Sequence, residues 1–133
     1  MMTKQLRILI IDDVTTTRSL IKRTLFSAGF VNFVEAENGH AALQKLSQEP
    51  FQLVISGWEM PRMTGLEMLQ NMRSNESQKK IPFILVTSVT ETNKVVSAIQ
   101  EGVDDYIIKP LKPDEFIKRV KTVLKKSQLV AVS

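Results

Sequence analysis

The chain alternates short aliphatic runs with longer amphipathic stretches, and this alternation constrains its fold more than any other feature. Residues 6–11 form a near-continuous aliphatic run, as a strand buried on both faces requires. Apolar residues at helical spacing follow at 14–28 and stop at Gly29. The same pair of patterns then recurs along the chain, with strands expected at 31–35, 51–56, 81–86 and 103–108 and helices at 40–47, 65–73, 91–100 and 113–126.

Strands that alternate with helices join through right-handed crossovers and build a parallel sheet. We therefore expect an α/β fold, a (βα)5 doubly wound, five-stranded parallel sheet of flavodoxin-like type with helices on both faces. A length of 133 residues suits one domain with one core. The expected domain covers residues 1–133, with the core at about 4–126 and a loose tail at 127–133.

Composition and charge exclude some kinds of site and leave others open. The absence of cysteine excludes disulfides, thiolate metal sites and a cysteine nucleophile, and it fits a cytoplasmic protein. No apolar run approaches the ~20 residues that span a bilayer. The net charge is +4, with the basic excess near the C-terminus, which indicates either a solvated helix face or a surface for an acidic partner.

Polar residues follow the expected strands, where the functional crevice of an open parallel sheet lies. They are Asp12 and Asp13 after the first strand, Gly57 to Pro61 after the third, Thr87 and Ser88 after the fourth, and Lys109 after the fifth. Carboxylate, carbonyl and water oxygens are the ligands of Mg²⁺. Hydroxyl and ammonium groups can hold phosphoryl oxygens. The combination suits a divalent cation beside a phosphoryl group.

These residues resemble the receiver domain of two-component response regulators, and most closely the single-domain chemotaxis receiver. The likeness extends over about residues 4–126 and rests on Asp12-Asp13, Trp58-Glu59-Met60-Pro61, Gly65, Thr87 and Lys109-Pro110. The resemblance implies that Asp12 and Asp13 bind Mg²⁺ and that the backbone carbonyl of Glu59 completes the metal site.

The resemblance also implies a phosphate pocket with a switch. Thr87 matches the hydroxyl that moves toward the phosphoryl group, and Lys109 matches the lysine that contacts it. Tyr106 matches the aromatic residue whose ring orientation reports the state of Thr87. The Lys109-Pro110 bond matches one that is often cis in the family. Thr87 and its neighbour Ser88 have the alternative role of capping the loop before the next helix.

Gly57 departs from the family pattern, which places an aspartate directly before Trp58. That aspartate attacks phosphorus and ligates the metal, and glycine can do neither. We therefore expect no phosphorylation at this position, no enzymatic activity, and weak or absent Mg²⁺ binding. The substitution is either natural, which makes the chain a pseudo-receiver, or engineered to block phosphorylation.

Two neighbours of Gly57 offer a substitute group. Glu59 is either an exposed loop acid or a side chain that reaches into the space left at Gly57. Ser56 is a candidate acceptor, but neighbouring strand residues point to opposite faces and an unactivated hydroxyl is a poor nucleophile.

The favoured function is a non-catalytic signalling module that contacts a sensor kinase or a downstream target. The expected partner face comprises residues 91–100, 103–108 and 113–126, in a monomer or weak dimer. Its apolar centre and basic rim would suit an acidic amphipathic helix, through Val95, Val96, Ile99, Tyr106, Lys118 and Arg119.

Three alternatives belong to other classes. An active phosphotransfer receiver would need another acceptor. A nucleotide or flavin binder is disfavoured because no glycine-rich loop follows the first strand. A nucleic-acid binder would rely on the basic last helix, but no recognition motif accompanies that charge.

Overall fold

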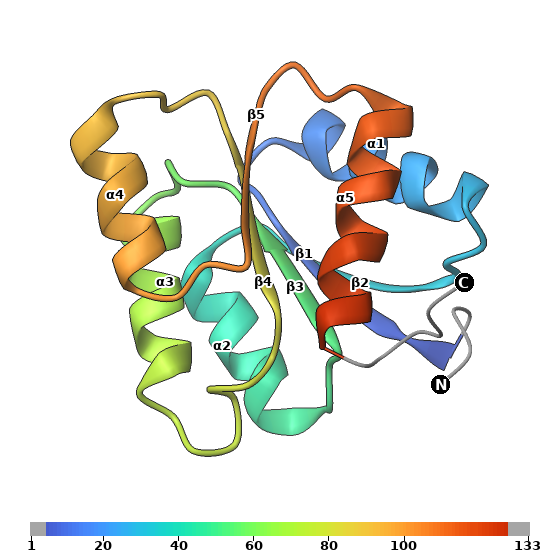
Figure 1. Cartoon of the computed structure of the whole chain (residues 1–133). Helices are drawn as coiled ribbons and strands as arrows, with labels where there is room; N and C mark the ends of the chain where they lie inside the picture. Colours follow the sequence, from blue (N-terminus) through green and yellow to red (C-terminus); the bar gives the residue numbers. More distant parts are fainter. Residues whose placement is uncertain (1–4, 128–133) are drawn as a thin grey trace.

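The computed structural model describes residues 5–127, in which strands and helices alternate (Figure 1). The strands form one parallel sheet in the order β2-β1-β3-β4-β5, which confirms the doubly wound α/β fold. The predicted tail lies outside the described residues apart from Ser127. The elements are β1 (Arg7–Ile11), α1 (Thr15–Ser27), β2 (Asn32–Ala36), α2 (Gly39–Gln48), β3 (Leu53–Ser56), α3 (Gly65–Arg73), β4 (Phe83–Thr87), α4 (Thr92–Gln100), β5 (Asp105–Ile108) and α5 (Pro113–Lys126).

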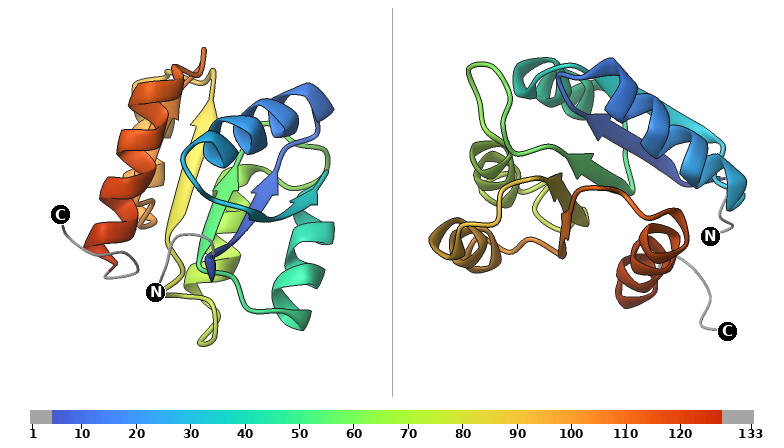
Figure 2. Two further views of the ribbon diagram at one scale, coloured as in Figure 1. Left: turned by 90° about the vertical axis from the view of Figure 1, so that its right-hand side faces the viewer. Right: turned by 90° about the horizontal axis from the view of Figure 1, so that it is seen from above.

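The helices cover both faces of the sheet, because successive side chains of a strand point to opposite sides. In β1, Leu9 and Ile11 pack into a cluster with residues of α2, α3 and α4. Ile8 and Ile10 pack into a second cluster with residues of α1 and α5. The two layers are visible on either side of the sheet in Figure 2. This double burial explains why β1 is aliphatic at nearly every position.

The ends of the helices follow local sequence signals. Gly29 and Gly102 adopt φ values of 97° and 90° just after α1 and α4, a backbone conformation that glycine accommodates without a Cβ penalty. Thr64 forms a capping box with Glu67 at the start of α3. Pro113 occupies the first turn of α5.

Some expected boundaries differ from the structure, and some apolar helix residues are only partly buried. β5 begins at Asp105 and not at residue 103, because the amide of Val103 donates to the carbonyl of Ala98 and closes the end of α4. The helical residues Leu66 and Ile117 are half-buried, and Leu20 is 38% exposed. Each lies at the edge of its helix's apolar stripe, where contact with the sheet is partial.

The topology sets the position of the site. β1 pairs with β2 on one side and with β3 on the other, so the direction of chain winding reverses between β1 and β3. The carboxyl ends of these two strands therefore flank the crevice in which ligands of such sheets bind. Among residues 5–127, no helix is both long and apolar enough to cross a membrane.

Candidate functional site

The carboxyl ends of β1, β3, β4 and β5 surround a cavity of about 290 Å³. Below it is called the acidic pocket. It brings together the residues predicted from the ends of four separate strands, namely Asp12, Asp13, Gly57, Glu59, Thr87, Ser88 and Lys109. Tyr106, on β5, does not line this pocket but connects to it through the loop after β4.

Asp12 is the central charged group of the acidic pocket. Its side chain is buried; Oδ1 accepts a hydrogen bond from the Val14 amide at 2.8 Å, and Oδ2 lies 3.7 Å from Lys109 Nζ. Burial raises the pKa of the Asp12 carboxyl, against the opposing effects of the Val14 hydrogen bond and the Lys109 charge. Asp13, by contrast, is exposed. Lys109 therefore makes its ion pair with Asp12.

The space above Gly57 is occupied by Asp12. A Cβ added to Gly57 would lie 2.7 Å from Asp12 Oδ2, closer than real Cβ atoms approach an oxygen. The other nearest atoms belong to Asp12 and Ile11, and the Glu59 side chain is exposed. The hypothesis that Glu59 fills this space is therefore wrong. The short loop after β1 places a carboxylate there directly, whereas Glu59 lines the pocket with an exposed side chain.

The loop between β4 and α4 is held by both predicted switch residues. Thr87 is buried, and its Oγ1 accepts a hydrogen bond from the Val89 amide at 3.1 Å. Tyr106 donates its hydroxyl to the Val89 carbonyl at 2.6 Å. The Tyr106 ring is half-buried, with its centroid 6.3 Å from that of the buried Trp58. One peptide segment thus connects the pocket hydroxyl to the aromatic ring, and Thr87 performs the loop-capping role.

Asp12 and Asp13 are the pocket carboxylates that the resemblance assigns to Mg²⁺. Mg²⁺ in proteins is often held by one or two carboxylates together with water. Asp12 and Asp13 supply two, but both oxygens of Asp12 already have partners. Within residues 5–127, no three His, Cys, Asp or Glu side chains are grouped so that they could hold a metal ion.

Arg18 and Glu35 support the pocket and were not predicted from the sequence. Arg18 Nη1 donates to the Asp12 carbonyl at 2.5 Å, and its Nε donates to Glu35 Oε1 at 3.0 Å. Lys22 Nζ lies 3.1 Å from Glu35 Oε2, and the hydrogen bonds from Lys22 and Arg18 lower the pKa of the Glu35 carboxyl. The i,i+4 spacing of Arg18 and Lys22 was the available signal, but the partner depends on the pairing of β2 with β1, where Glu35 lies opposite Ile10.

Comparison with known proteins identifies the family. Residues 8–121 match the family described as response regulator receiver domain. The chain belongs to this family. The receiver is 38% identical over 107 residues to the chemotaxis protein CheY-3 of Vibrio cholerae, an overlap of 80% of this chain and 82% of the relative. It is 33% identical over 121 residues to the chemotaxis protein CheY of Pseudomonas aeruginosa, which covers 91% and 98% of the two chains.

Solved structures agree with this assignment. The receiver resembles chemotaxis protein CheY4 of Vibrio cholerae with a TM-score of 0.83 and 29% identity, over 90% of this chain and 98% of the other. It resembles the receiver domain of a signal transduction histidine kinase from Syntrophus aciditrophicus with a TM-score of 0.84 and 29% identity, over 96% of both chains. The resemblance predicted from the pocket residues is thus confirmed, and the Lys109-Pro110 peptide bond is cis, as that resemblance implied.

Proposed function

We propose that this receiver signals through protein contact and without a phosphorylation cycle at the usual position. The observation that carries the proposal is the state of Gly57, where no side chain can attack phosphorus and where the Asp12 carboxylate fills the adjacent space. The nearest hydroxyl does not replace the missing carboxylate. Ser56 is fully buried, and its Oγ donates to the Gly57 carbonyl at 2.9 Å. The proposed module is therefore not an enzyme.

The proposed partner face comprises α4, β5 and α5. Val96 and Ile99 on α4 are 43% and 61% exposed, and Ile108 on β5 is 41% exposed. Such apolar side chains, beside cationic ones, support binding of an amphipathic and acidic segment of a sensor kinase or downstream target. Val95 and Tyr106 are half-buried, so they would contribute through their edges.

The two cations predicted for the basic rim, Lys118 and Arg119, differ in whether they already have an acidic partner. Lys118 is exposed, but Arg119 makes two short hydrogen bonds to Asp105, at 2.8 and 2.6 Å. These bonds raise the pKa of the Arg119 guanidinium. Arg119 therefore holds α5 against β5, and its charge is largely offset before any partner arrives.

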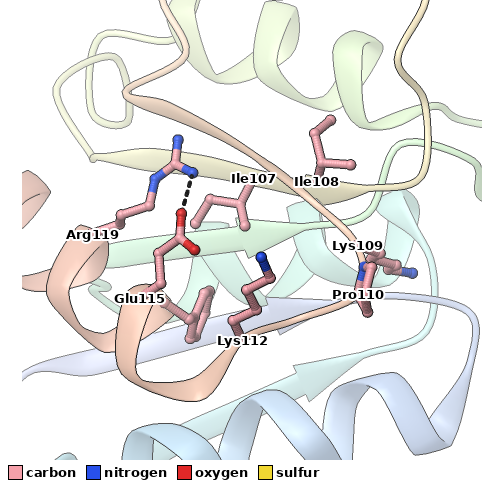
Figure 3. A pocket seen from close by; sticks show the side chains of 8 residues that line it. Ile107, Ile108, Lys109, Pro110, Lys112, Glu115 and Arg119 are labelled. Carbon is pink, nitrogen blue, oxygen red and sulfur yellow. Dashed lines mark ion pairs between the residues drawn. The ribbon is translucent and has the colours of Figure 1, made fainter.

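A cavity of about 310 Å³ beside this rim offers a place for a partner side chain. Figure 3 shows the Glu115–Arg119 ion pair, 3.6 Å long, on one side of it and Lys109-Pro110 on the other. Buried Ile107 and Phe116 form apolar parts of its lining. The apolar lining and the Lys112 ammonium support recognition of a partner segment in which an acidic residue stands next to an apolar one.

Asp12 and Asp13 would hold Mg²⁺ weakly, and the bound ion would supply positive charge that offsets the two carboxylates. The proposed receiver is a single domain over residues 1–133, a monomer or weak dimer, and cytoplasmic, in keeping with its cysteine-free composition.

The acceptor is tested with Gly57→Asp and with its uncharged, similarly shaped control Gly57→Asn. The parent and both variants are treated with Mg²⁺ and a small phosphoryl donor or beryllofluoride, and intact mass and Trp58 fluorescence are recorded. Only Gly57→Asp is expected to gain the mass of one phosphoryl group and the fluorescence change. A phosphorylated parent chain would refute the proposal and reveal another acceptor.

The partner face is tested by truncating one of its side chains. Val95→Ala is expected to weaken binding to the sensor kinase or downstream target, while Phe26→Ala, which removes an apolar side chain 63% exposed on α1, leaves it unchanged. Affinity for each partner is measured by isothermal titration calorimetry. Equal affinity of Val95→Ala and the parent for every partner would exclude this face.

A further inference from the structure

A separate cavity of about 480 Å³ lies between α1 and the loop that joins β5 to α5. Here it is called the α1 groove. It borders the acidic pocket, since Val86, Ser88 and Lys109 line both. Its lining is mostly apolar and includes one charged residue, Lys109. The apolar lining residues are Leu20, Ile21, Val86, Pro110 and Leu111.

The apolar lining of the α1 groove combines fixed walls with an accessible rim. Ile21 and Val86 are core residues, only 2% and 1% exposed, whereas Leu20 is 38% exposed. Small-molecule sites are typically cavities of roughly 300–1,000 Å³ with a mostly apolar lining and a few polar groups that orient the ligand. The groove has this size and this kind of lining.

Lys109 supplies the one charged group of the lining. Its ammonium has three hydrogen-bond donors. Its contact with Asp12 Oδ2 is 3.7 Å long, beyond hydrogen-bond length, and among residues 5–127 Nζ donates no hydrogen bond. In Figure 3 the Lys109 side chain extends away from Glu115 and Arg119. The ammonium therefore has donors to spare at the edge of an apolar groove.

We propose that the α1 groove binds a small amphiphile composed of an aliphatic chain and a carboxylate. The chain lies along Leu20 and Leu111, and the carboxylate accepts hydrogen bonds from Lys109 Nζ. Asp12 keeps its hydrogen bond from Val14 when Lys109 turns toward the ligand. The site goes beyond the proposed partner-binding function and stands whether or not that function is correct.

A ligand series tests both parts of the proposal on the full chain. Octanoate, octanol and acetate are titrated by calorimetry, and leucine methyl NMR locates the binding. Octanoate is expected to saturate the site and to shift the Leu20 and Leu111 methyl signals. Octanol and acetate should bind at least about tenfold more weakly, about 1.4 kcal/mol. Octanol as strong as octanoate, shifts at other leucines, or no saturable binding of octanoate would each overturn the proposal.

Matched variants distinguish binding in the α1 groove from non-specific binding to exposed apolar side chains. Leu20→Gln, which keeps a good helix former at an exposed position, should weaken octanoate binding about tenfold. Phe26→Gln changes a more exposed apolar residue on the same helix, outside the groove, and should leave the affinity unchanged. Lys109→Met should remove the preference for octanoate over octanol. Equal effects of Leu20→Gln and Phe26→Gln would show that the groove is not the site.

Discussion

Replacing Gly65 with alanine should destabilise the fold, and Gly39 provides a control at the same helix position. Each is the first residue of its helix and follows a capping side chain, Thr64 for α3 and Asn38 for α2. A Cβ at Gly65 would overlap the Gly57 carbonyl oxygen and lie 2.8 Å from Leu85 Cδ2. Because the amide of Gly65 also donates to the Trp58 carbonyl at 2.7 Å, the two backbone segments cannot separate without losing that bond.

The expected cost follows from what each new methyl group meets. Overpacking against fixed atoms costs about 1–3 kcal/mol, and alanine returns up to about 1 kcal/mol in backbone entropy. Gly65→Ala should therefore lower the free energy of unfolding by about 2 kcal/mol. At Gly39 the methyl group would lie 2.6 Å from Met63 Sδ, in a flexible thioether side chain that can move. Gly39→Ala should stay within about 1 kcal/mol of the parent.

Urea unfolding followed by far-ultraviolet circular dichroism measures the difference. With a slope of about 2 kcal/mol/M, Gly65→Ala should shift the midpoint down by about 1 M, and Gly39→Ala by less than half of that. Similar shifts for the two variants would mean that the loss comes from removing a helix-start glycine, and the close-approach explanation would be refuted.

Two further predictions concern the supports of the pocket. The pKa of Glu35 is lowered from its ordinary value of 4.5 by Lys22 and Arg18, so its contribution to stability is present above that value and is lost as the pH falls through the lowered pKa. The urea midpoint of the parent should exceed that of Glu35→Gln at pH 7, and the gap should close toward pH 3; a constant gap would argue against the ion pairs. Tyr106→Phe removes the hydrogen bond to the Val89 carbonyl and should cost about 1 kcal/mol of unfolding free energy at pH 7, whereas an unchanged midpoint would show that water replaces the hydroxyl without loss.

The fold was predictable because each element carries its own local signal. The aliphatic run of β1 requires burial on both faces, and Gly29 and Gly102 mark the helix ends that the structure shows. The start of β5 was less predictable, since Val103 has a strand-like side chain but its amide completes the turn after α4. Helix closure outweighed β propensity at that position.

The candidate site was predictable only in part, for reasons of geometry. Residues at the carboxyl ends of parallel strands must meet, so the acidic pocket followed from the strand order. The Asp12 side chain fills the space above Gly57, and the hydrophobic pattern of the sequence does not predict the direction of that side chain. The Arg18–Glu35 pair likewise depends on the register of β2 against β1, and the groove beside α1 arises from the path of a loop.

The position of the Asp12 carboxylate lets the Lys109 ammonium offset most of its negative charge. With Gly57, one buried carboxylate faces one ammonium, and the exposed Asp13 is screened by water. A carboxylate at position 57 would add a negative charge beside Asp12, and an added cation would then be needed to relieve the repulsion. In the structure the Lys109 ammonium, and no added ion, is the positive charge that faces the buried Asp12 carboxylate.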